Sequence, residues 1–265
     1  MTRPWLTIVT VVKDDLSGFL TTANSIAEQD LSDVEYLVVD SSSRRNSIAE
    51  VLAEPPPSLS ALVGLTMYSW EPPSGIYEAM NSALSKARGR YILFLNAGDR
   101  LVGGGVLDRA RPILTNVDVV WGYADVEIED TYGTVVRTPP WDFESERAHL
   151  FARGYFPCHQ GTFVSTDALR HIGGFDTRFT IAADYASFLA LSKISGPIHL
   201  DFVVARFIEG GASTVQWRRS VLEFHKARRR VLQPRGAASV LEYLHTMIHF
   251  MKLGTYRGLV RRWRT

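Results

Sequence analysis

The stretch YILFLNAGD, residues 91–99, decides the fold class of this chain. Its first five residues are apolar without interruption, which is typical of a strand that is buried on both faces of a parallel sheet. An amide, a glycine and an acid then follow at Asn96, Gly98 and Asp99. An apolar strand that ends abruptly in polar residues predicts a ligand site at the carboxyl edge of such a sheet.

The sequence before residue 91 alternates apolar strands with amphipathic helices. In the predicted helices the apolar residues recur at helical spacing, as Ile76, Met80 and Ala83 show. The alternation predicts an α/β fold with a Rossmann-like, mostly parallel central sheet and helices on both faces. The predicted strands are 6–12, 34–40, 65–70 and 90–95, and the predicted helices are 16–27, 47–53 and 76–87.

The pattern changes after residue 115. Two apolar segments flank a turn at Asp130–Gly133, which predicts a β-hairpin. The sequence GGFD, residues 173–176, separates two predicted helices. We also expect a flexible turn at GGAS, residues 210–213, and helical structure from there to the end of the chain. The other predicted elements are strands at 159–165 and 198–208 and helices near 166–172 and 183–194.

The composition fits one α/β domain with an extension. The chain has 265 residues, of which 46% are hydrophobic and 22% are charged. Cys158 is the single cysteine, so no internal disulfide forms and we expect a reducing, cytoplasmic setting. The first residues lack the cleavage region of a signal peptide, and no window reaches the roughly 18 apolar residues of a membrane span.

The formal net charge of +1 hides an asymmetry along the chain. Residues 217–265 hold 12 Lys and Arg against 2 Glu, a net charge of +10, and the remaining 17 basic and 26 acidic residues sum to −9. A basic tail on an acidic body predicts contact with an anionic surface, such as the inner face of the plasma membrane. The alternative is a helical pair that packs on the main domain. No motif supports binding of nucleic acid.

Asp40 ends the second predicted strand, in the sequence VVDSSS. Its carboxylate suits contact with the base or ribose of a nucleotide. The alternative is an Asp that forms a turn and caps the next helix. No G-x-G-x-x-G sequence follows the first strand, so the dinucleotide-binding fingerprint is absent.

Asn96 and Asp99 follow the fourth predicted strand. Hard divalent cations take oxygen ligands, and Mg²⁺ typically takes one or two carboxylates plus substrate phosphates. Asp99 suits that role at the edge of the sheet. The alternative is a turn that Gly98 eases, with Asp99 as a helix cap.

Asp184 lies at the start of an apolar helix in TIAADYASFLAL. The helix dipole stabilises a carboxylate there, so both a cap and a general base remain open. His159 and Gln160 follow Cys158 directly. Adjacent Cys and His side chains diverge, so this pair suits neither nucleophilic catalysis nor a metal site. A buried structural histidine is the alternative to a functional one.

Five segments of the chain, taken in order, resemble the family 2 glycosyltransferases, which are inverting enzymes with the fold called GT-A. The resemblance covers about residues 5–213. Its most specific part runs from GIYEAMN to FLNAGD and is similar to enzymes that build bacterial surface polysaccharides and glycolipids. The segments are TIVTVVKDD, VEYLVVDSSS, SGIYEAMNSALSKARGRYILFLNAGD, HQGTFVS with GGFD, and AADY.

The resemblance implies a role for each candidate residue. Asp184 matches the usual general base, and Asp40 matches the acid that contacts the nucleotide base. Asn96 matches the first acid of the Asp-x-Asp metal motif and Asp99 the acid just after its second, which places both at the nucleotide. The other matches are Thr10, Val11 and Val12, which would line the nucleotide pocket largely through the backbone, and His159 and Gln160, which fall on the sugar or acceptor side.

The chain departs from the family pattern where a metal would be held. Asn96 and Gly98 occupy the two Asp-x-Asp positions, which leaves Asp99 as the one acidic metal ligand. An amide oxygen also coordinates metals, so we expect a weakly bound divalent cation, Mn²⁺ or Mg²⁺. Ala183 replaces the Glu that commonly precedes the base, so Asp184 stands alone.

The resemblance implies an inverting, hexosyl-type glycosyltransferase. It would move a sugar from a nucleotide sugar to a hydroxyl of a saccharide or lipid-linked acceptor in cell-envelope synthesis. A UDP-sugar is the donor expected first, with GDP- and TDP-sugars as alternatives. Residues 1–215 would form the catalytic domain, with a nucleotide-binding half of about 1–100 and an acceptor half of about 115–215, and residues 216–265 a basic helical extension.

Two other functions stay open at the level of sequence. A nucleotidyltransferase that makes nucleotide sugars would share the fold, but it normally needs a glycine-rich, basic loop after the first strand, and VVKDDLSGF offers little of that. The depleted metal motif also fits a sugar-nucleotide or polysaccharide binding module that has lost turnover. A base at Asp184 argues against the binding module, because a binder has no use for one.

Overall fold

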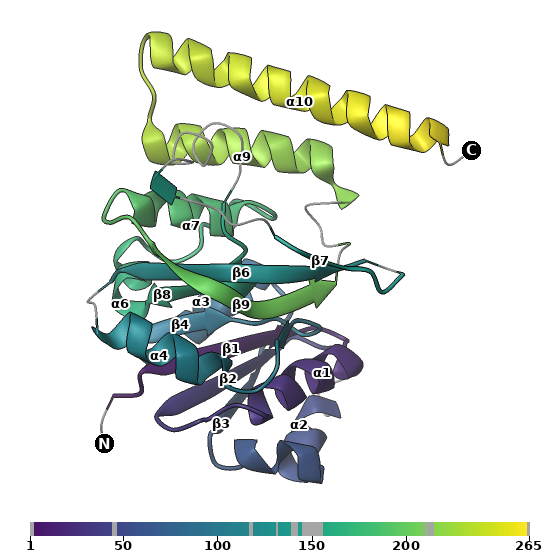
Figure 1. Ribbon diagram of the computed structural model, residues 1–265, viewed down its shortest axis with the longest axis vertical. Helices are drawn as coiled ribbons and strands as arrows, with labels where there is room; N and C mark the ends of the chain where they lie inside the picture. The colour runs from purple at the N-terminus through teal and green to yellow at the C-terminus, as the bar shows by residue number, and fades with distance from the viewer. Residues whose placement is uncertain are drawn as a thin grey trace.

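The structure of the protein, a computed structural model, describes residues 3–43, 47–116, 119–130, 132–138, 143–144, 156–208, 210 and 215–263, with side chains up to residue 254. A central sheet lies in the middle of the molecule, with helices packed around it (Figure 1). In the described residues its strand order is β3-β2-β1-β4-β8-β6-β9-β5, with β7 paired to β6. The strands are β1 (Leu6–Val12), β2 (Val34–Asp40), β3 (Thr66–Trp70), β4 (Tyr91–Phe94), β5 (Arg100–Leu101), β6 (Trp121–Glu129), β7 (Val135–Arg137), β8 (Thr162–Ser165) and β9 (Ile198–Ile208).

The first half of the sheet is parallel, as its apolar strands predict. β1 pairs in parallel with β2 and β4, and β2 pairs in parallel with β3. The second half is mixed: β8 is antiparallel to both β4 and β6, whereas β9 is parallel to β6. Because the four parallel strands share one direction, their carboxyl ends meet at one edge, where Asp40 lies opposite Val12 and Trp70.

Helices cover both faces of the sheet and divide the core into two layers. Phe19, Ile48 and Leu107 pack on one face, and Met80 and Leu189 pack on the other. The helices and 3₁₀ turns are α1 (Leu16–Ala27), α2 (Ser47–Ala53), η1 (Pro57–Leu62), α3 (Ile76–Lys86), α4 (Val106–Asn116), η2 (His159–Gly161), α6 (Thr166–His171), α7 (Ala183–Ser192), α9 (Trp217–Leu232) and α10 (Ala237–Trp263).

Strand β1 shows why the sequence specifies this architecture. All seven of its residues are buried. Leu6, Ile8 and Val12 belong to one core layer, whereas Val9 and Val11 belong to the other. Successive side chains of a strand point to opposite faces, so a sheet covered on both faces requires apolar residues at both odd and even positions, as β1 has apart from the buried Thr7 and Thr10.

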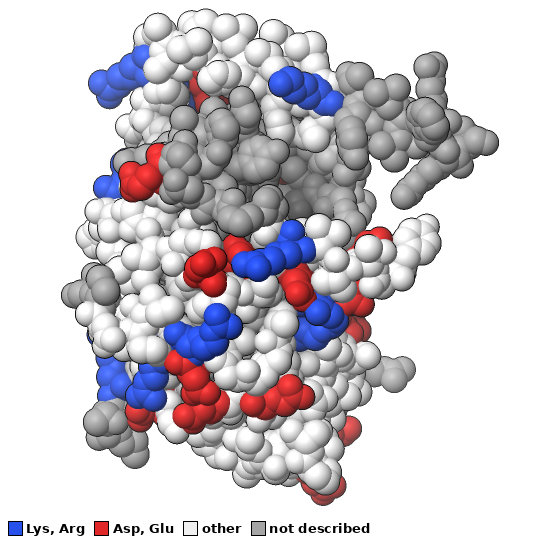
Figure 2. All heavy atoms as spheres, in the orientation of Figure 1, with Lys and Arg blue, Asp and Glu red and all other residues white. Residues whose placement is uncertain are grey.

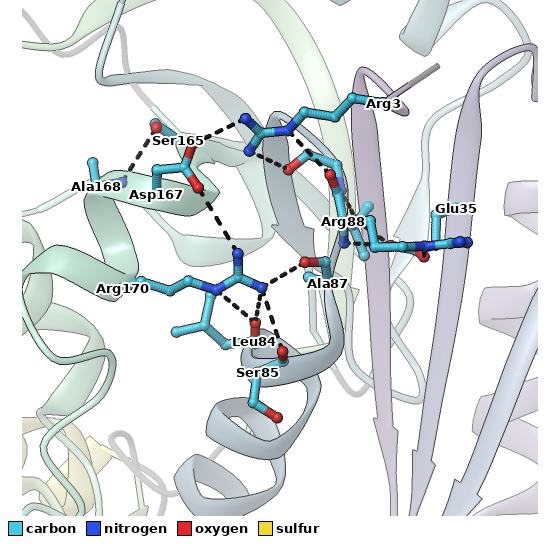
Figure 3. A network of polar contacts seen from close by, with 12 residues as sticks. Arg3, Glu35, Leu84, Ser85, Ala87, Arg88, Ser165, Asp167, Ala168 and Arg170 are labelled. Atoms are coloured by element: carbon cyan, nitrogen blue, oxygen red, sulfur yellow. Dashed lines mark hydrogen bonds and ion pairs between the residues drawn. The ribbon is translucent and has the colours of Figure 1, made fainter. Parts of the chain in front are cut away.

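A polar network fixes α6 against the end of α3 (Figure 3). The guanidinium of Arg170 donates to the carbonyl oxygens of Leu84 at 2.7 Å and Ala87 at 2.5 Å. These are the unpaired carbonyls at the carboxyl end of α3, which a cation stabilises both by hydrogen bonding and through the helix dipole. Asp167, also in α6, pairs with Arg3 at 3.0 Å, so the same network reaches the residues before β1.

The two carboxyl-terminal helices stack on the outside of α7 (Figure 1). Phe224 of α9 packs edge-on against Tyr185 of α7, with ring centroids 5.0 Å apart. α10 then packs on α9, where Trp217 meets Phe250 at 5.2 Å. The alternative that the tail packs on the main domain is therefore confirmed for α9, and α10 forms a further, outermost layer.

The structure differs from the sequence-based expectations in two respects, namely three unexpected elements and one reassigned segment. η1, β5 and α4 were not expected; α4 follows three consecutive glycines and contains Pro112, both of which mask a helical pattern. Residues 159–161, expected to begin a strand, form the 3₁₀ turn η2 instead. Most of the turn expected at 210–213 lies outside the described residues.

Candidate active site

The segment Asn96–Asp99 forms a tight turn directly after β4. The N–H of Asp99 donates to the carbonyl of Asn96 at 2.9 Å, and Gly98 has a φ of 95°, which favours glycine. Thr22 of α1 holds this turn, because its hydroxyl donates to the carbonyl of Asp99 at 2.6 Å and accepts the N–H of Gly98 at 3.1 Å. The side chains at 96 and 99 are thus fixed by the body of the protein.

The carboxylate of Asp99 lies almost entirely inside the protein, with 8% of the residue exposed. It accepts the N–H of Asn96 at 3.1 Å and a hydrogen bond from Gln160. Burial raises the pKa of Asp99 to about 6, although His159, Gln160 and Asn96 each lower it. Asp99 is therefore a carboxyl group that takes up a proton near neutral pH.

His159 connects this turn to Asp184. The amide of Asn96 donates to Nε2 of His159 at 3.2 Å, which places the ring proton on Nδ1. That nitrogen faces Oδ2 of Asp184 at an ion-pair distance of 3.6 Å. Burial lowers the pKa of His159, but the carboxylates of Asp184 and Asp99 outweigh burial and hold the pKa above its usual value.

Asp184 stands in the first turn of α7 and is 9% exposed. The N-cap of this helix is Ala182, so Asp184 is not the cap, although its Oδ1 accepts the N–H of Tyr185 at 2.7 Å. The hydroxyl of Tyr77 lies 3.3 Å from the same oxygen and donates to the carbonyl of Ile181 at 2.7 Å. Oδ2 is left to face His159.

The backbone that leads to Asp184 is held by Glu223 of α9. One carboxylate oxygen of Glu223 accepts the N–H groups of Thr180, Ile181 and Ala182 at 3.0, 2.8 and 3.2 Å. These amides lie just before α7, where helical bonds are not available to them. The carboxyl-terminal extension is therefore bonded to the segment that positions the candidate base.

A cavity of about 510 Å³ opens beside this cluster at the carboxyl edge of the parallel strands. Asn96 and Ala97 line it, and Asn96 also contacts His159. The remaining lining residues come from the ends of β1 and β2 and from the segment before α3: Val11, Lys13, Asp15, Ser41, Pro73, Ser74, Gly75 and Ile76. A cavity of this size suits a nucleotide or a small sugar.

Asp40 lies behind the wall of this cavity, fully buried. Its Oδ1 accepts the N–H of Ser42 at 2.8 Å, and its Oδ2 accepts the hydroxyl of Tyr68 at 3.0 Å. These are the bonds of the turn-forming alternative. Ser41, the next residue, does line the cavity. The structure thus brings Asn96, Asp99, His159, Gln160 and Asp184 together, whereas the carboxylate of Asp40 bonds to Ser42 and Tyr68.

The three residues of β1 that were expected to line the nucleotide pocket, Thr10, Val11 and Val12, lie in different surroundings. Val11 lines the cavity. Thr10 is fully buried and donates to the carbonyl of Leu95 at 2.9 Å, and Val12 belongs to the core. The carbonyls of Val11 and Val12 accept the N–H groups of Ala97 and Ser41, so both bonds hold the polar edge of the sheet together.

One buried polar atom at this site bears on whether a cation fits. Oδ1 of Asn96 is buried and accepts no hydrogen bond within the part of the chain that the structure describes. Buried acceptors without partners are rare and call for an explanation such as an ion. The described residues contain no cluster of three or more His, Cys, Asp or Glu side chains for a metal. One amide oxygen and the carboxylate of Asp99 therefore suit a cation that takes its other ligands from substrate phosphates.

Several residues of the site were not predicted from the sequence. Lys13 and Ser41 line the cavity, and Thr22, Tyr77 and Glu223 hold the groups around it. Lys13 was within reach of prediction, because it directly follows β1 on the same sheet edge. Glu223 was not, since nothing in the sequence of α9 marks residues 180–182 as its partners.

The fold and the site together define a glycosyltransferase of the GT-A class, and comparisons with known proteins agree. The family model described as glycosyl transferase family 2 matches residues 7–173. An uncharacterized glycosyltransferase of Mycobacterium tuberculosis is 27% identical over 215 residues, which cover 80% of this chain and 78% of that protein. The chain belongs to glycosyltransferase family 2.

Two further relatives have names that state a pathway. The PGL/p-HBAD biosynthesis glycosyltransferase of Mycobacterium bovis is 29% identical over 170 residues, which cover 61% of this chain and 59% of that protein. The O-antigen biosynthesis protein RfbC of Myxococcus xanthus is 26% identical over 217 residues, which cover 80% of this chain but 16% of that protein.

Solved structures share the fold at low sequence identity. Residues 1–349 of S. aureus TarS, in complex with UDP-GlcNAc, give a TM-score of 0.62 at 14% identity over 85% of this chain and 65% of that one. The mannosyltransferase PcManGT from Pyrobaculum calidifontis, in complex with GDP-Man and Mn²⁺, gives 0.61 at 17% identity over 94% and 70%. The match to another TarS chain spans 39% of its length.

Proposed function

We propose that this glycosyltransferase moves a hexose from a nucleotide-sugar donor to a hydroxyl group of a saccharide or lipid-linked acceptor, with inversion at the anomeric carbon. The observation that carries the proposal is the linked set Asn96–His159–Asp184, of which Asn96 also lines the 510 Å³ cavity. This link supports the proposal because it joins a carboxylate and a histidine to a residue that lines a space large enough for a nucleotide.

The proposed reaction is a single displacement. The acceptor oxygen attacks the anomeric carbon as the bond from that carbon to the diphosphate breaks, and the bonding electrons leave with the diphosphate. Oδ2 of Asp184 takes the hydroxyl proton, a role worth about 10²–10⁴-fold in rate for a positioned base. His159 keeps that oxygen oriented through its contact at 3.6 Å. The transition state resembles an oxocarbenium ion.

The donor side of the site is proposed to be the cavity itself. Ser41 and Lys13 at the ends of β2 and β1 suit a base or ribose and a diphosphate, respectively. UDP is the nucleotide we propose first, because TarS, with the same fold, binds UDP-GlcNAc; GDP is the alternative, as in PcManGT. Asp40 acts here by shaping the turn that presents Ser41.

A divalent cation, Mn²⁺ or Mg²⁺, is proposed to be held by Oδ1 of Asn96 and the carboxylate of Asp99. When bound, it offsets charge that develops on the leaving diphosphate. Its affinity is expected to be low without nucleotide, because the protein offers a single carboxylate and this one already accepts two hydrogen bonds.

The names of the relatives support an acceptor in the cell envelope. One is named for O-antigen biosynthesis and one for PGL/p-HBAD biosynthesis. We therefore place the reaction in cell-envelope polysaccharide or glycolipid synthesis, on the cytoplasmic side of the plasma membrane, where nucleotide sugars are made.

Replacement of Asp184 by Asn tests the proposal. The amide keeps the size and one acceptor oxygen but takes no proton, so transfer should fall at least about 100-fold. The thermal shift that UDP and Mn²⁺ produce should be the same as in the wild type, because the substitution leaves the nucleotide site unchanged. This shift is large enough to measure, because a ligand at 100 times its Kd stabilises the folded protein by about 2.7 kcal/mol. Asp108→Asn, an exposed acid in the first turn of α4, is the matched control. Wild-type turnover in Asp184→Asn would remove this residue from the mechanism.

A further inference from the structure

Helix α10 turns an apolar face to the outside of the molecule. Five large aliphatic side chains lie within an arc of about 120° at roughly 100° per residue. Each is between 42% and 60% exposed, whereas a helix on the surface of a globular protein normally presents its polar side to water. The five residues, called here the α10 stripe, are Val240, Leu241, Leu244, Met247 and Ile248.

The inner side of α10 is polar where it packs on α9. Glu242 accepts Nε of Arg228 at 2.7 Å, and the hydroxyl of Thr246 lies 2.9 Å from Nδ1 of His225. Glu242 and Thr246 are both buried. The apolar stripe therefore lies opposite the helix that α10 packs on, so the packing seen in the structure leaves it in contact with solvent.

The sequence of α10 and the residues after it is basic. Between Ala237 and Thr265 the chain has five basic residues and a single acid, Glu242, which is buried against Arg228. Lys252 is exposed on the described part of α10, and four of the arginines follow it in the sequence. Figure 2 shows mainly uncharged atoms at the end of the molecule where α10 lies, with a few isolated charged groups, whereas cations and acids alternate around β6 and β9.

We propose that the α10 stripe docks on an anionic phospholipid bilayer, with α10 lying in the plane of the interface. An exposed apolar arc on a helix with a basic sequence is the pattern of interfacial helices, and each basic residue near an anionic surface adds to the attraction. No helix in the described residues is long and apolar enough to cross a bilayer. Residues 217–265 carry a net charge of +10. A dimer formed through two stripes would bring two such segments together and they would repel, whereas an anionic bilayer neutralises the charge.

This surface is independent of the sugar chemistry proposed above, because docking needs neither donor nor acceptor. It would place the enzyme where a lipid-linked acceptor diffuses in two dimensions. Since α9 bonds the segment before Asp184 through Glu223, the docking layer and the candidate base belong to one packed unit.

Co-sedimentation of the full chain with vesicles tests the proposal. Vesicles of phosphatidylcholine with phosphatidylglycerol should bind the protein, and vesicles of phosphatidylcholine alone should bind it at least about tenfold less. Added salt should weaken the binding. The double variant Leu244→Asn/Ile248→Asn should lose about tenfold or more in affinity for the anionic vesicles. Val63→Asn/Met67→Asn, which changes two exposed apolar residues beside η1 and in β3, is the matched control.

The variants change half-exposed side chains, so thermal unfolding should match the wild type and confirm that they fold. Absence of wild-type binding to anionic vesicles, or equal binding by Leu244→Asn/Ile248→Asn, would overturn the proposal. Light scattering supplies the remaining outcome. A wild-type dimer that becomes monomeric in Leu244→Asn/Ile248→Asn would assign the stripe to a second copy of the chain and likewise overturn it.

Discussion

The side-chain amide of Asn81 pairs with both backbone polar groups of Phe175. Nδ2 donates to the carbonyl at 2.8 Å, and Oδ1 accepts the N–H at 2.9 Å. Asn81 ends the GIYEAMN sequence of α3, and Phe175 belongs to the GGFD turn, 94 residues later. The ring of Phe175 then stacks on Tyr77, with centroids 5.7 Å apart, and Tyr77 contacts Asp184. Two of the family-like motifs are thus one structural unit that positions the candidate base.

Replacement of Asn81 by Ala should destabilise the protein. It leaves the N–H and carbonyl of the buried Phe175 without partners, which costs about 1–3 kcal/mol. At this chain length that corresponds to a fall in Tm of about 2–4 °C per kcal/mol. Urea unfolding of the ligand-free protein measures the loss. Ser85→Ala, an exposed site at the end of the same helix, should stay within about 0.5 kcal/mol of wild type. Equal stability of the two variants would contradict the role of the amide.

Glu223 should matter to activity although it lies in the carboxyl-terminal extension. Glu223→Ala removes the acceptor for three backbone N–H groups just before α7, so we expect a loss of about 1–3 kcal/mol and a lower kcat. Glu223→Gln keeps an acceptor oxygen and should recover most of both. The measurement is steady-state kinetics beside urea unfolding. A normal kcat in a destabilised Glu223→Ala protein would show that the contact supports folding alone.

The pH dependence of this contact has a definite sign. Desolvation raises the pKa of Glu223, but hydrogen bonds from Ile181, Thr180 and Arg219 outweigh it and hold the pKa below its usual 4.5. A carboxyl group with a lowered folded-state pKa stabilises the protein above its unfolded-state pKa. The stability difference between wild type and Glu223→Gln should therefore shrink as the pH falls below about 4.5.

The parts of the fold that were predictable are those that local sequence determines. β1 and β2, and the helices α1 and α2, match their predicted bounds because apolar periodicity is a property of contiguous residues. The site was predictable only to the level of individual positions. His159 lies between Asn96 and Asp184 because β4 pairs with β8. The pairing register of two strands cannot be predicted from the sequence of either strand alone.

Asp40 shows where a sequence pattern leaves two roles open. An acid at the carboxyl end of a strand fits both a turn and a ligand contact, and burial distinguishes them only when the neighbouring strand is in place. Tyr68, which occupies one carboxylate oxygen, comes from β3, 28 residues away. The contact of Asp40 with a nucleotide base stays a prediction, which a substitution of Asp40 tests.

Replacement of Asp40 by Asn separates these two roles. Asn retains an acceptor for the N–H of Ser42 and gains a donor for the hydroxyl of Tyr68, so the turn should persist and UDP affinity should stay within about threefold. Tyr68→Phe should cost about 1 kcal/mol, because it removes one partner of a buried acceptor. Calorimetric titration with UDP gives the affinity. A loss of tenfold or more in Asp40→Asn at unchanged stability would show direct contact with the nucleotide.

The burial of Asp99 predicts how pH alters the stability of the ligand-free protein. Its pKa is about 6 in the folded state against a usual 3.8, so the folded protein binds this proton more tightly. The free energy of unfolding contributed by this group should rise as the pH falls from about 7 to about 4, by about 3 kcal/mol at most. Asp99→Asn lacks the titration, and the difference between its urea-unfolding curves and those of the wild type isolates the effect. Parallel pH dependences would contradict the burial of a charged group here.

The same proton should compete with a cation at Asp99. A carboxylate must lose its proton to coordinate, so affinity for Mn²⁺ in the presence of UDP should fall by up to about tenfold per pH unit below about 6. Asn96→Ala removes the buried amide oxygen but leaves the carboxyl group, so it should weaken Mn²⁺ binding at every pH without flattening that slope. Calorimetric titrations at several pH values separate the two contributions. A pH-independent affinity between about pH 5 and 6 would exclude Asp99 as a ligand, and unchanged affinity in Asn96→Ala would leave the unpaired oxygen without a role in cation binding.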